Sequence, residues 1–593
     1  MEDLREQRYR KLLDIGLALS TERNSTRLME QILNEAKTMC NADGGTLYRV
    51  IDDDRRLKFE IMRNDSLNIY NGGTSGNEIT LPPVELYDPE TGEENHKNVA
   101  SFCALSKNTI SVDDAYTFKD FDFSGTKKFD EATGYRSKSF LTVPLYNNEG
   151  RVIAVLQLLN SQDRDTGEVV PFDTTLQPFV EALAAQAAIA LDNQLLVEAQ
   201  KELLASFISL IAGAIDAKSA YTGGHCQRVP VLTDMLADAA KAATDGVFAD
   251  FDMSEEDQYE LHIAGLLHDC GKVTTPEYIV DKATKLETIY DRIHEVRMRF
   301  EVMKRDAEIN YLKAVAAGGD EKGLKEAFDK RIAQLDDDFA FIAECNVGGD
   351  FMAPERIERL DKISQLNWTR TISDRLGIGH EEKTRKEAAG VEPSLPVVEK
   401  ILSDRADHIF VRQDKSLFEE GNPYGFNMAP PENLYNQGEL YNLKVKAGTL
   451  TEEDRFKIND HIVQTIIMLD QLPFPRHLKR VPEYAGGHHE KMDGTGYPRK
   501  LTADDMSWPA RMMAVADIFE ALTAADRPYK LPKTLSQSVK IMSFMAKDNH
   551  IDKDLFELFL TSGKYKEYAE RFLKPEQLDE VDISQYVKTG DEG

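Results

Sequence analysis

The sequence predicts a multidomain protein. We expect an N-terminal α+β domain with an antiparallel sheet and flanking helices, a long connecting helix, and a C-terminal all-α helical domain with an inserted helical hairpin. Three observations indicate this. The chain has 593 residues, too many for one hydrophobic core. Its apolar pattern changes from helical spacing to alternation and back within the N-terminal third. From about Ser206 onward the pattern is almost entirely helical.

The N-terminal elements follow in a clear order. Helical spacing predicts two amphipathic helices over residues 5–42. Residues 44–64 then form two strand-like runs joined by an Asp/Arg turn. Residues 139–160, "SFLTVPLYNNEGRVIAVLQLLN", predict a β-hairpin around an Asn-Asn-Glu-Gly turn. The apolar stretch 176–217 predicts one long helix, which suits a connection between paired subunits.

This order of elements resembles a GAF domain over about residues 8–195. The segment "KKFDEATGYRSKS" is similar to the segment before the hairpin in GAF domains of the cyclic-nucleotide type. Asn160 and Phe172 fit their downstream signature, whereas Ser161 stands where lysine is expected. The resemblance implies either that this domain binds an unknown small ligand or that it binds none and serves in dimerisation. Both alternatives stay open. The predicted boundaries are 1–195 for the GAF-like sensory or dimerisation domain, 196–215 for the connecting helix, 216–580 for the C-terminal domain and 581–593 for a tail.

Composition limits the possible partners. The net charge is −31, from 72 basic and 103 acidic residues, which argues against nucleic-acid polymers and anionic membranes as partners. It leaves room for one small anionic substrate. The five cysteines form neither a CxxC motif nor an even framework, which is typical of a reduced compartment. No run approaches about 18 apolar residues, so we expect a cytoplasmic protein.

Histidine and aspartate residues embedded in apolar helices carry the chemistry. They are His225, His268, Asp269, His461, His488, His489 and Asp517. Imidazole and carboxylate together suit transition metals such as Fe, Mn, Ni or Zn. Seven ligands are too many for one tetrahedral ion and suit two ions that share a carboxylate. Two such ions, about 3.5–4 Å apart, activate a water for phosphoryl transfer, so the residues predict a binuclear phosphohydrolase.

Three motifs across about residues 205–580 resemble the HD-GYP family of the HD superfamily of metal phosphohydrolases: "HDCGK", "HHEKMDGTGYP" and "ADIFEALTAADRPYK". Members of that family hydrolyse the second messenger cyclic di-GMP. GAF followed by HD-GYP is a familiar arrangement in bacterial signal transduction.

The resemblance implies a role for each site residue. The first metal would be held by His225, His268, Asp269 and Asp517, and Asp269 would bridge to a second metal held by His461, His488 and His489. The implied catalytic residues are Asp269 and Lys272, with Lys272 beside the scissile phosphate. The implied substrate contacts are Lys272, Gly496, Tyr497, Pro498, Arg527 and Lys530. Tyr221 stands where some relatives place a glutamate for a third metal, so we predict two divalent ions, Fe or Mn, with Ni, Zn or Co as alternatives.

An insertion is predicted at about 283–435. Some 190 residues separate "HDCGK" from His461, where minimal HD-GYP members have a short link. Charged periodic residues over 283–345 predict a helical hairpin that turns at Gly318-Gly319, followed by a less regular segment. The insertion would cover the substrate groove or extend a dimer interface.

The resulting hypothesis is a cyclic di-GMP phosphodiesterase regulated by its GAF domain. A hydroxide activated by both metals would open the ring to give pGpG, which some relatives cut further to GMP. We expect a homodimer, with other signalling proteins as further partners. Two alternatives stay open: a phosphodiesterase for another cyclic dinucleotide such as 3′,3′-cGAMP, and a non-catalytic cyclic di-GMP receptor.

Overall fold

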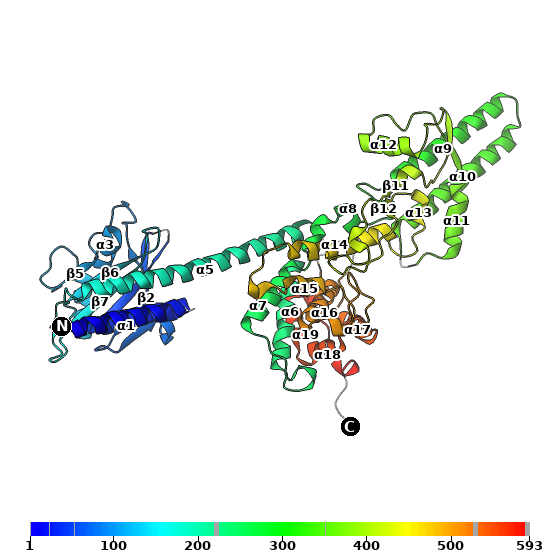
Figure 1. The fold of residues 1–593 in the computed structure, drawn as a ribbon. Coiled ribbons are helices and arrows are strands. Elements are labelled where there is room, and N and C mark those ends of the chain that lie inside the picture. The colour runs from blue at the N-terminus through cyan, green and yellow to red at the C-terminus, as the bar shows by residue number, and fades with distance from the viewer. Residues whose placement is uncertain are drawn as a thin grey trace, which may run out of the picture. The chain divides into compact units, whose positions relative to one another are not determined.

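The computed structural model describes residues 2–22, 24–52, 54–218, 224–349, 351–525 and 532–587. The chain divides into two compact units, Met1–Ala205 and Ser206–Gly593. Figure 1 colours the chain from its N-terminus in blue to its C-terminus in red. Among the described residues, no helix is long and apolar enough to cross a membrane.

The first unit contains an antiparallel sheet in the order β3-β2-β1-β7-β6-β5, with β4 paired to β2 and β8 paired to β7. Its strands are β1 (Ala42–Ile51), β2 (Arg56–Asn64), β3 (Ile69–Gly72), β4 (Val84–Glu85), β5 (Ile110–Val112), β6 (Phe140–Tyr146), β7 (Val152–Gln162) and β8 (Val169–Val170). The two predicted hairpins are present as β1–β2 and β6–β7. The pairing of β1 with β7 joins them, and this contact between distant segments has no local signal in the sequence.

Helices cover both faces of this sheet. Apolar residues of α1 (Glu2–Thr21), α2 (Ser25–Cys40) and the first half of α5 (Gln177–Lys218) share one core with the sheet. The shorter α3 (Val99–Ser106) packs on a second core, against residues of β1, β2 and β7. The predicted α+β domain with an antiparallel sheet and flanking helices is confirmed, as is the long helix that follows it.

The second unit is mostly helical. Its principal helices are α6 (His225–Ala242), α7 (Glu255–Leu267), α14 (Glu452–Asp470), α15 (Val481–Gly486), α16 (Trp508–Thr523), α17 (Leu535–Lys547), α18 (Lys553–Thr561) and α19 (Lys564–Phe572). Capping boxes begin three of them: Ser254 with Asp257 at α7, Thr451 with Asp454 at α14, and Thr534 with Gln537 at α17. Helix α6 contacts both α7 and α16, which brings together residues 292 positions apart in the chain.

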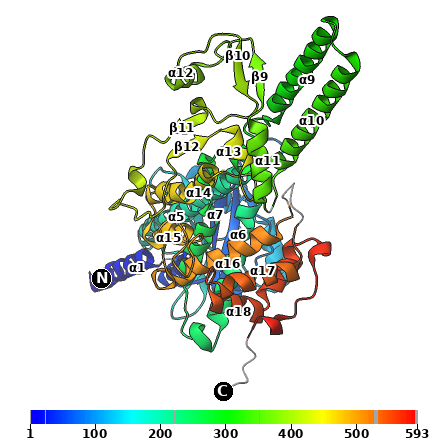
Figure 2. The ribbon, with the colours of Figure 1, turned by 90° about the vertical axis from the view of Figure 1, so that its right-hand side faces the viewer.

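The predicted helical hairpin is present in the second unit. Helices α9 (Ile293–Ala316) and α10 (Glu321–Val347) lie side by side, and the turn between them contains Gly318 (Figure 2). The segment after it is more ordered than expected. It forms α11 (Pro354–Ser364), α12 (His380–Ala389), α13 (Glu439–Leu443) and two small antiparallel sheets, β9 (Asn367–Arg370) with β10 (Val397–Lys400) and β11 (Ile409–Val411) with β12 (Asn433–Asn436). A separate hydrophobic core joins α9, α10, α11 and α13, and Trp368 of β9 packs against it.

Candidate metal centre

The seven predicted ligands converge from five helices. His225 is the first residue of α6, and it follows Gly224, whose φ of 78° lets the chain turn into the helix. His268 and Asp269 end α7, His461 lies in α14, His488 and His489 follow α15, and Asp517 lies in α16. Because the pieces are distant in the sequence, only tertiary packing brings them together.

The first group contains two imidazoles and two carboxylates. The Nε2 atom of His225 lies 3.2 Å from Nε2 of His268 and 3.2 Å from Oδ1 of Asp517. The Oδ2 atom of Asp269 lies 3.3 Å from each of the same two ring nitrogens. Four donor atoms therefore surround one small space.

The second group contains three imidazoles. Donor atoms of His461, His488 and His489 lie within 4.8 Å of one another, with 3.1 Å between Nε2 of His461 and Nε2 of His489. The Oδ1 atom of Asp269 lies 3.2 Å from Nε2 of His461. The two oxygens of one carboxylate thus face different groups, which is the arrangement that a bridging ligand requires.

Hydrogen bonds at Nδ1 fix the tautomer of the rings. Nδ1 of His268, His461 and His488 donates to the carbonyl oxygen of Gly265, Ile458 and Ala485, at 2.7, 2.6 and 2.6 Å. Each bond leaves the lone pair on Nε2, directed into the centre. Lone pairs that meet at about 3 Å repel one another unless a cation lies between them, so this donor set fits metal ions.

Two buried atoms support the same fit. Oδ1 of Asp269 and Nε2 of His488 are buried and form no hydrogen bond with any described residue. Buried polar atoms are nearly always satisfied, so such atoms require an explanation. Coordination of metal ions by these two atoms supplies one.

The charge environment differs between the groups. Burial opposes protonation of His225 and His268, but the neighbouring carboxylates outweigh it, so the pKa of His225 is raised well above its ordinary value and that of His268 to about 9. The first group therefore stabilises positive charge. Burial and neighbouring imidazoles lower the pKa of His488 to about 4 and hold that of His489 well below its usual range. Those two rings are neutral at pH 7, the form in which a histidine binds a metal, whereas His225 and His268 would lose their protons when an ion binds.

Close packing holds the two groups in register. A Cβ atom on Gly271 would lie 1.9 Å from the carbonyl oxygen of His461, so only glycine allows the segment after α7 to approach α14 this closely. The backbone N–H of Gly271 donates to Oγ1 of Thr465, at 2.9 Å. The ligands of α7 and α14 are thereby tied together.

The predicted substrate contacts lie in different surroundings. The Lys272 ammonium contacts Oδ2 of Asp269; burial lowers its pKa, but that carboxylate outweighs burial and raises it. The Tyr497 ring stacks on His489 at 4.9 Å, and Gly496 and Pro498 are buried in the same turn. A Cβ on Gly496 would lie 2.4 Å from the backbone nitrogen of Lys491, which explains that glycine. Arg527 and Lys530, like Tyr221, lie outside the described residues.

One side of the centre is more open than the other. Lys272, His489 and Asp517 are partly exposed, whereas His225, His268, Asp269, His461 and His488 are buried. A substrate would reach the centre from the side of the partly exposed residues.

Glu520 is a functional residue that sequence reasoning missed. It is 1% exposed, contacts Nδ1 of His225, and accepts a hydrogen bond from Nε of Arg228 at 2.8 Å. Its carboxylate contacts Nδ1 of His225, as backbone carbonyl oxygens contact Nδ1 of three other rings, and so orients the His225 ring. A signal was available: Glu520 follows Asp517 by three residues in an apolar helix, so both carboxylates lie on one face.

Comparison with known proteins identifies the domains. A GAF-domain family model matches residues 24–191, and two HD-domain family models match residues 222–335 and 396–555. The two HD matches together contain all seven ligands. The gap between them, 336–395, falls inside the predicted insertion; the limits of that insertion and the domain boundaries stay predictions.

Curated relatives match part of this chain. The 3'3'-cGAMP-specific phosphodiesterase 1 of Vibrio cholerae serotype O1 is 34% identical over 119 residues, which cover 20% of this chain and 27% of the relative. The 3'3'-cGAMP-specific phosphodiesterase 3 of that organism is 40% identical over 98 residues, covering 16% and 20%. Its probable cyclic di-GMP phosphodiesterase is 29% identical over 157 residues, covering 26% and 35%. The chain thus spans about a fifth to a third of the length of these relatives. It is built from a GAF domain followed by an HD domain.

Proposed function

We propose that this chain is a metal-dependent phosphodiesterase of the HD-GYP type that hydrolyses cyclic di-GMP to pGpG. The observation that carries the proposal is the Asp269 carboxylate, whose two oxygens face two separate imidazole groups 3.2–3.3 Å away. The names of the curated relatives support a cyclic dinucleotide as the substrate.

In this proposal His225, His268 and Asp517 would hold one ion, His461, His488 and His489 would hold the other, and Asp269 would be a ligand of both. Divalent transition-metal ions, when bound, lower the pKa of water toward neutrality and neutralise charge on a phosphoryl group. The donor set, imidazole with carboxylate, favours Fe or Mn over Ca or Mg.

The chain's own residues then orient the substrate. Lys272 lies at the open side of the centre, where its ammonium stabilises the negative charge that develops on the phosphate. The Tyr497 ring, held against His489, shapes the wall beside the second group. Arg527 and Lys530 are proposed as further phosphate contacts on sequence grounds alone.

The GAF domain is proposed as the regulatory part, acting through α5 within a homodimer. Ile189, Leu196, Leu203 and Leu210 of α5 recur every seventh residue and are 53–68% exposed. A seven-residue apolar repeat on an exposed helix favours pairing with another helix, as in a coiled coil. The ligand of the GAF domain stays unnamed.

A second substrate has specific support. Two of the relatives are named as 3'3'-cGAMP-specific phosphodiesterases, so this dinucleotide is the alternative to cyclic di-GMP. A non-catalytic receptor is the less favoured function, because receptors of this kind are expected to lose ligands and here all seven converge.

Hydrolysis assays with the full chain test the proposal. Cyclic di-GMP and 3′,3′-cGAMP are each incubated with iron- or manganese-loaded protein, and products are separated by chromatography. We expect hydrolysis by the wild type and none by the His268→Ala, Asp269→Ala double variant. His262→Ala is the matched control, since His262 lies on the same helix and bonds Asp234 instead, at 2.7 Å. Equal rates for wild type and double variant would refute the proposal, and binding without hydrolysis would identify a receptor.

A further inference from the structure

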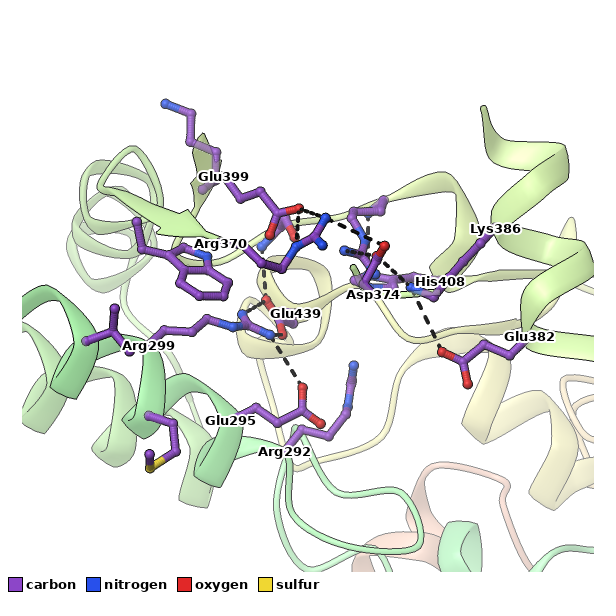
Figure 3. Close-up of a pocket in the computed structure, with 16 residues that line it drawn as sticks. Arg292, Glu295, Arg299, Arg370, Asp374, Glu382, Lys386, Glu399, His408 and Glu439 are labelled. Atoms are coloured by element: carbon purple, nitrogen blue, oxygen red, sulfur yellow. Dashed lines mark hydrogen bonds and ion pairs between the residues drawn. The ribbon is translucent and has the colours of Figure 1, made fainter. Parts of the chain in front are cut away.

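A pocket lies in the part of the second unit built on α9, α12, β9, β10 and α13. All of its lining residues except Glu439 fall within the predicted insertion. It has a volume of about 470 Å³, which lies in the range of about 300–1,000 Å³ typical of small-molecule sites. No predicted metal ligand lines it. Figure 3 shows it in close-up.

The walls are unusually rich in charge, and most of that charge is already paired. Arg299 holds Glu439 with two hydrogen bonds of 2.8 Å, and Arg370 holds Glu399 at 2.9 and 3.1 Å (Figure 3). Ion pairs of this kind fix the side chains of both partners, so the walls are preorganised.

The Lys386 side of the pocket is built in the same way. Its ammonium lies 3.0 Å from a carboxylate oxygen of Asp374 and 3.0 Å from one of Asp407, and Arg405 also bonds Asp407, at 2.8 and 3.0 Å. Two cations thus share two carboxylates, and this wall is close to neutral.

Arg292 is the exception. Its guanidinium donates only to backbone oxygens, to that of Gln437 at 2.8 Å and that of Leu286 at 3.2 Å. No carboxylate of the described residues lies within ion-pair distance of it, and in Figure 3 no dashed line joins it to any other side chain of the pocket. Burial lowers the pKa of this guanidinium and outweighs the more distant carboxylates of Glu439 and Glu295, which raise it. Arg292 is therefore a desolvated cation that forms no direct ion pair with any described residue.

Two further features complete the pocket. Lys400 lines the exposed rim of the pocket and donates to the carbonyl oxygen of Gln365, at 3.1 Å. It forms no ion pair with a carboxylate of the described residues, so it adds a second cation. The Trp368 indole also lines the pocket and is half-buried, which offers a flat apolar surface.

We propose that this pocket is a binding site for a small organic anion, one that carries a phosphate or carboxylate group on a flat ring system. The oxyanion pairs with Arg292, whose planar guanidinium suits two-point contact with either group, and the ring packs on Trp368. The site is separate from the metal centre and does not depend on the proposed hydrolase activity.

Calorimetric titration of the full chain tests this site with three probes. Adenosine monophosphate represents the phosphate class, benzoate the carboxylate class, and adenosine the ring without an anion. We expect one of the two anions to bind, and adenosine to bind at least about tenfold more weakly than adenosine monophosphate if the phosphate is the anion recognised. The stronger anion identifies the class. Equal binding of adenosine and adenosine monophosphate, or no binding of either anion up to about 10 mM, would overturn the proposal.

Variants locate the binding. Arg292→Gln should weaken the affinity for the anion at least about tenfold. Lys400→Gln, at the exposed rim, should weaken it a few-fold. Arg297→Gln is the matched control, because Arg297 lies on the same helix, is exposed and does not line the pocket. If Arg292→Gln unfolds, as judged by circular dichroism, Lys400→Gln decides. Wild-type affinity in the folded Arg292 variant, or in the Lys400 variant when the Arg292 variant is unfolded, would show that the anion binds elsewhere.

Discussion

Replacing Glu520 by glutamine removes the carboxylate that orients His225 and keeps the side-chain shape. Glu520 is 1% exposed and His225 is 5% exposed, so water cannot take the place of the lost charge on that side. Breaking a buried charge pair costs about 3–5 kcal/mol, but the Arg228 side chain is 21% exposed and recovers part of its hydration. We therefore expect Glu520→Gln to lower the free energy of unfolding by about 2–3 kcal/mol.

The same change should weaken metal binding. A residue that holds the far nitrogen of a metal-binding histidine contributes about 10–100-fold to metal affinity. Competition with a fluorescent chelator measures the affinity for Mn²⁺, and urea unfolding measures stability. Glu567→Gln is the control, because Glu567 is a largely exposed carboxylate of the same unit and pairs with Lys564 at 2.7 Å; we expect a change within about 0.5 kcal/mol. Unchanged Mn²⁺ affinity in folded Glu520→Gln would refute the role assigned to this carboxylate.

Three further predictions follow from the geometry. Gly271→Ala places a Cβ 1.9 Å from the His461 carbonyl oxygen and should lower the free energy of unfolding, measured in urea, by about 3 kcal/mol or more. Gly213→Ala is the control: a Cβ at Gly213 has no atom within 4 Å, so this change should raise the free energy of unfolding by about 0.5–1 kcal/mol. Equal effects of the two substitutions would contradict the packing argument. Removing divalent metal with a chelator should lower the melting temperature of the wild type, since metal at about 100 times its Kd stabilises the folded chain by about 2.7 kcal/mol. The chelator should leave the melting temperature of the His268→Ala, Asp269→Ala variant unchanged. The pKa of Asp407 is lowered to about 2, because Lys386 and Arg405 outweigh the effect of its burial. A depressed folded-state pKa gives stability that is present above the unfolded-state pKa near 4 and is lost as the pH falls toward 2. Asp407→Asn should therefore destabilise the insertion by about 2 kcal/mol at pH 6 and by about half as much at pH 3. Fluorescence of Trp368 in a Trp508→Phe background reports this unfolding, and a difference independent of pH would contradict it.

Much of the N-terminal domain could be predicted from local patterns. The two hairpins and the long helix α5 have strong periodicity, and a periodic segment needs few distant contacts to be identified. The central pairing of β1 with β7 could not be predicted in this way, because no local signal joins residues more than 100 positions apart. The segment after the helical hairpin is similar: its strands are four residues or shorter, and tertiary packing, not propensity, decides them.

In the candidate centre, too, some residues could be predicted from the sequence and others depend on tertiary packing. Residue chemistry and motif order led us to predict the seven side chains that converge here, because imidazole and carboxylate in apolar helices have few uses other than metal binding. Glu520 was missed, since a glutamate near a helix end is ordinarily solvated and its partner His225 is 295 residues away. The pocket around Arg292 was also not foreseen, because its cations and carboxylates come from separate elements whose packing the sequence does not reveal.

The central claim is that two imidazole groups share Asp269 and hold two ions. Metal content of the full chain, purified without oxygen and measured by mass spectrometry, tests it most directly. We expect about two ions per wild-type chain and about one in each of the variants His225→Ala and His489→Ala, one variant for each group. A wild-type content near zero in metal-replete protein, or a content that neither substitution changes, would contradict the account.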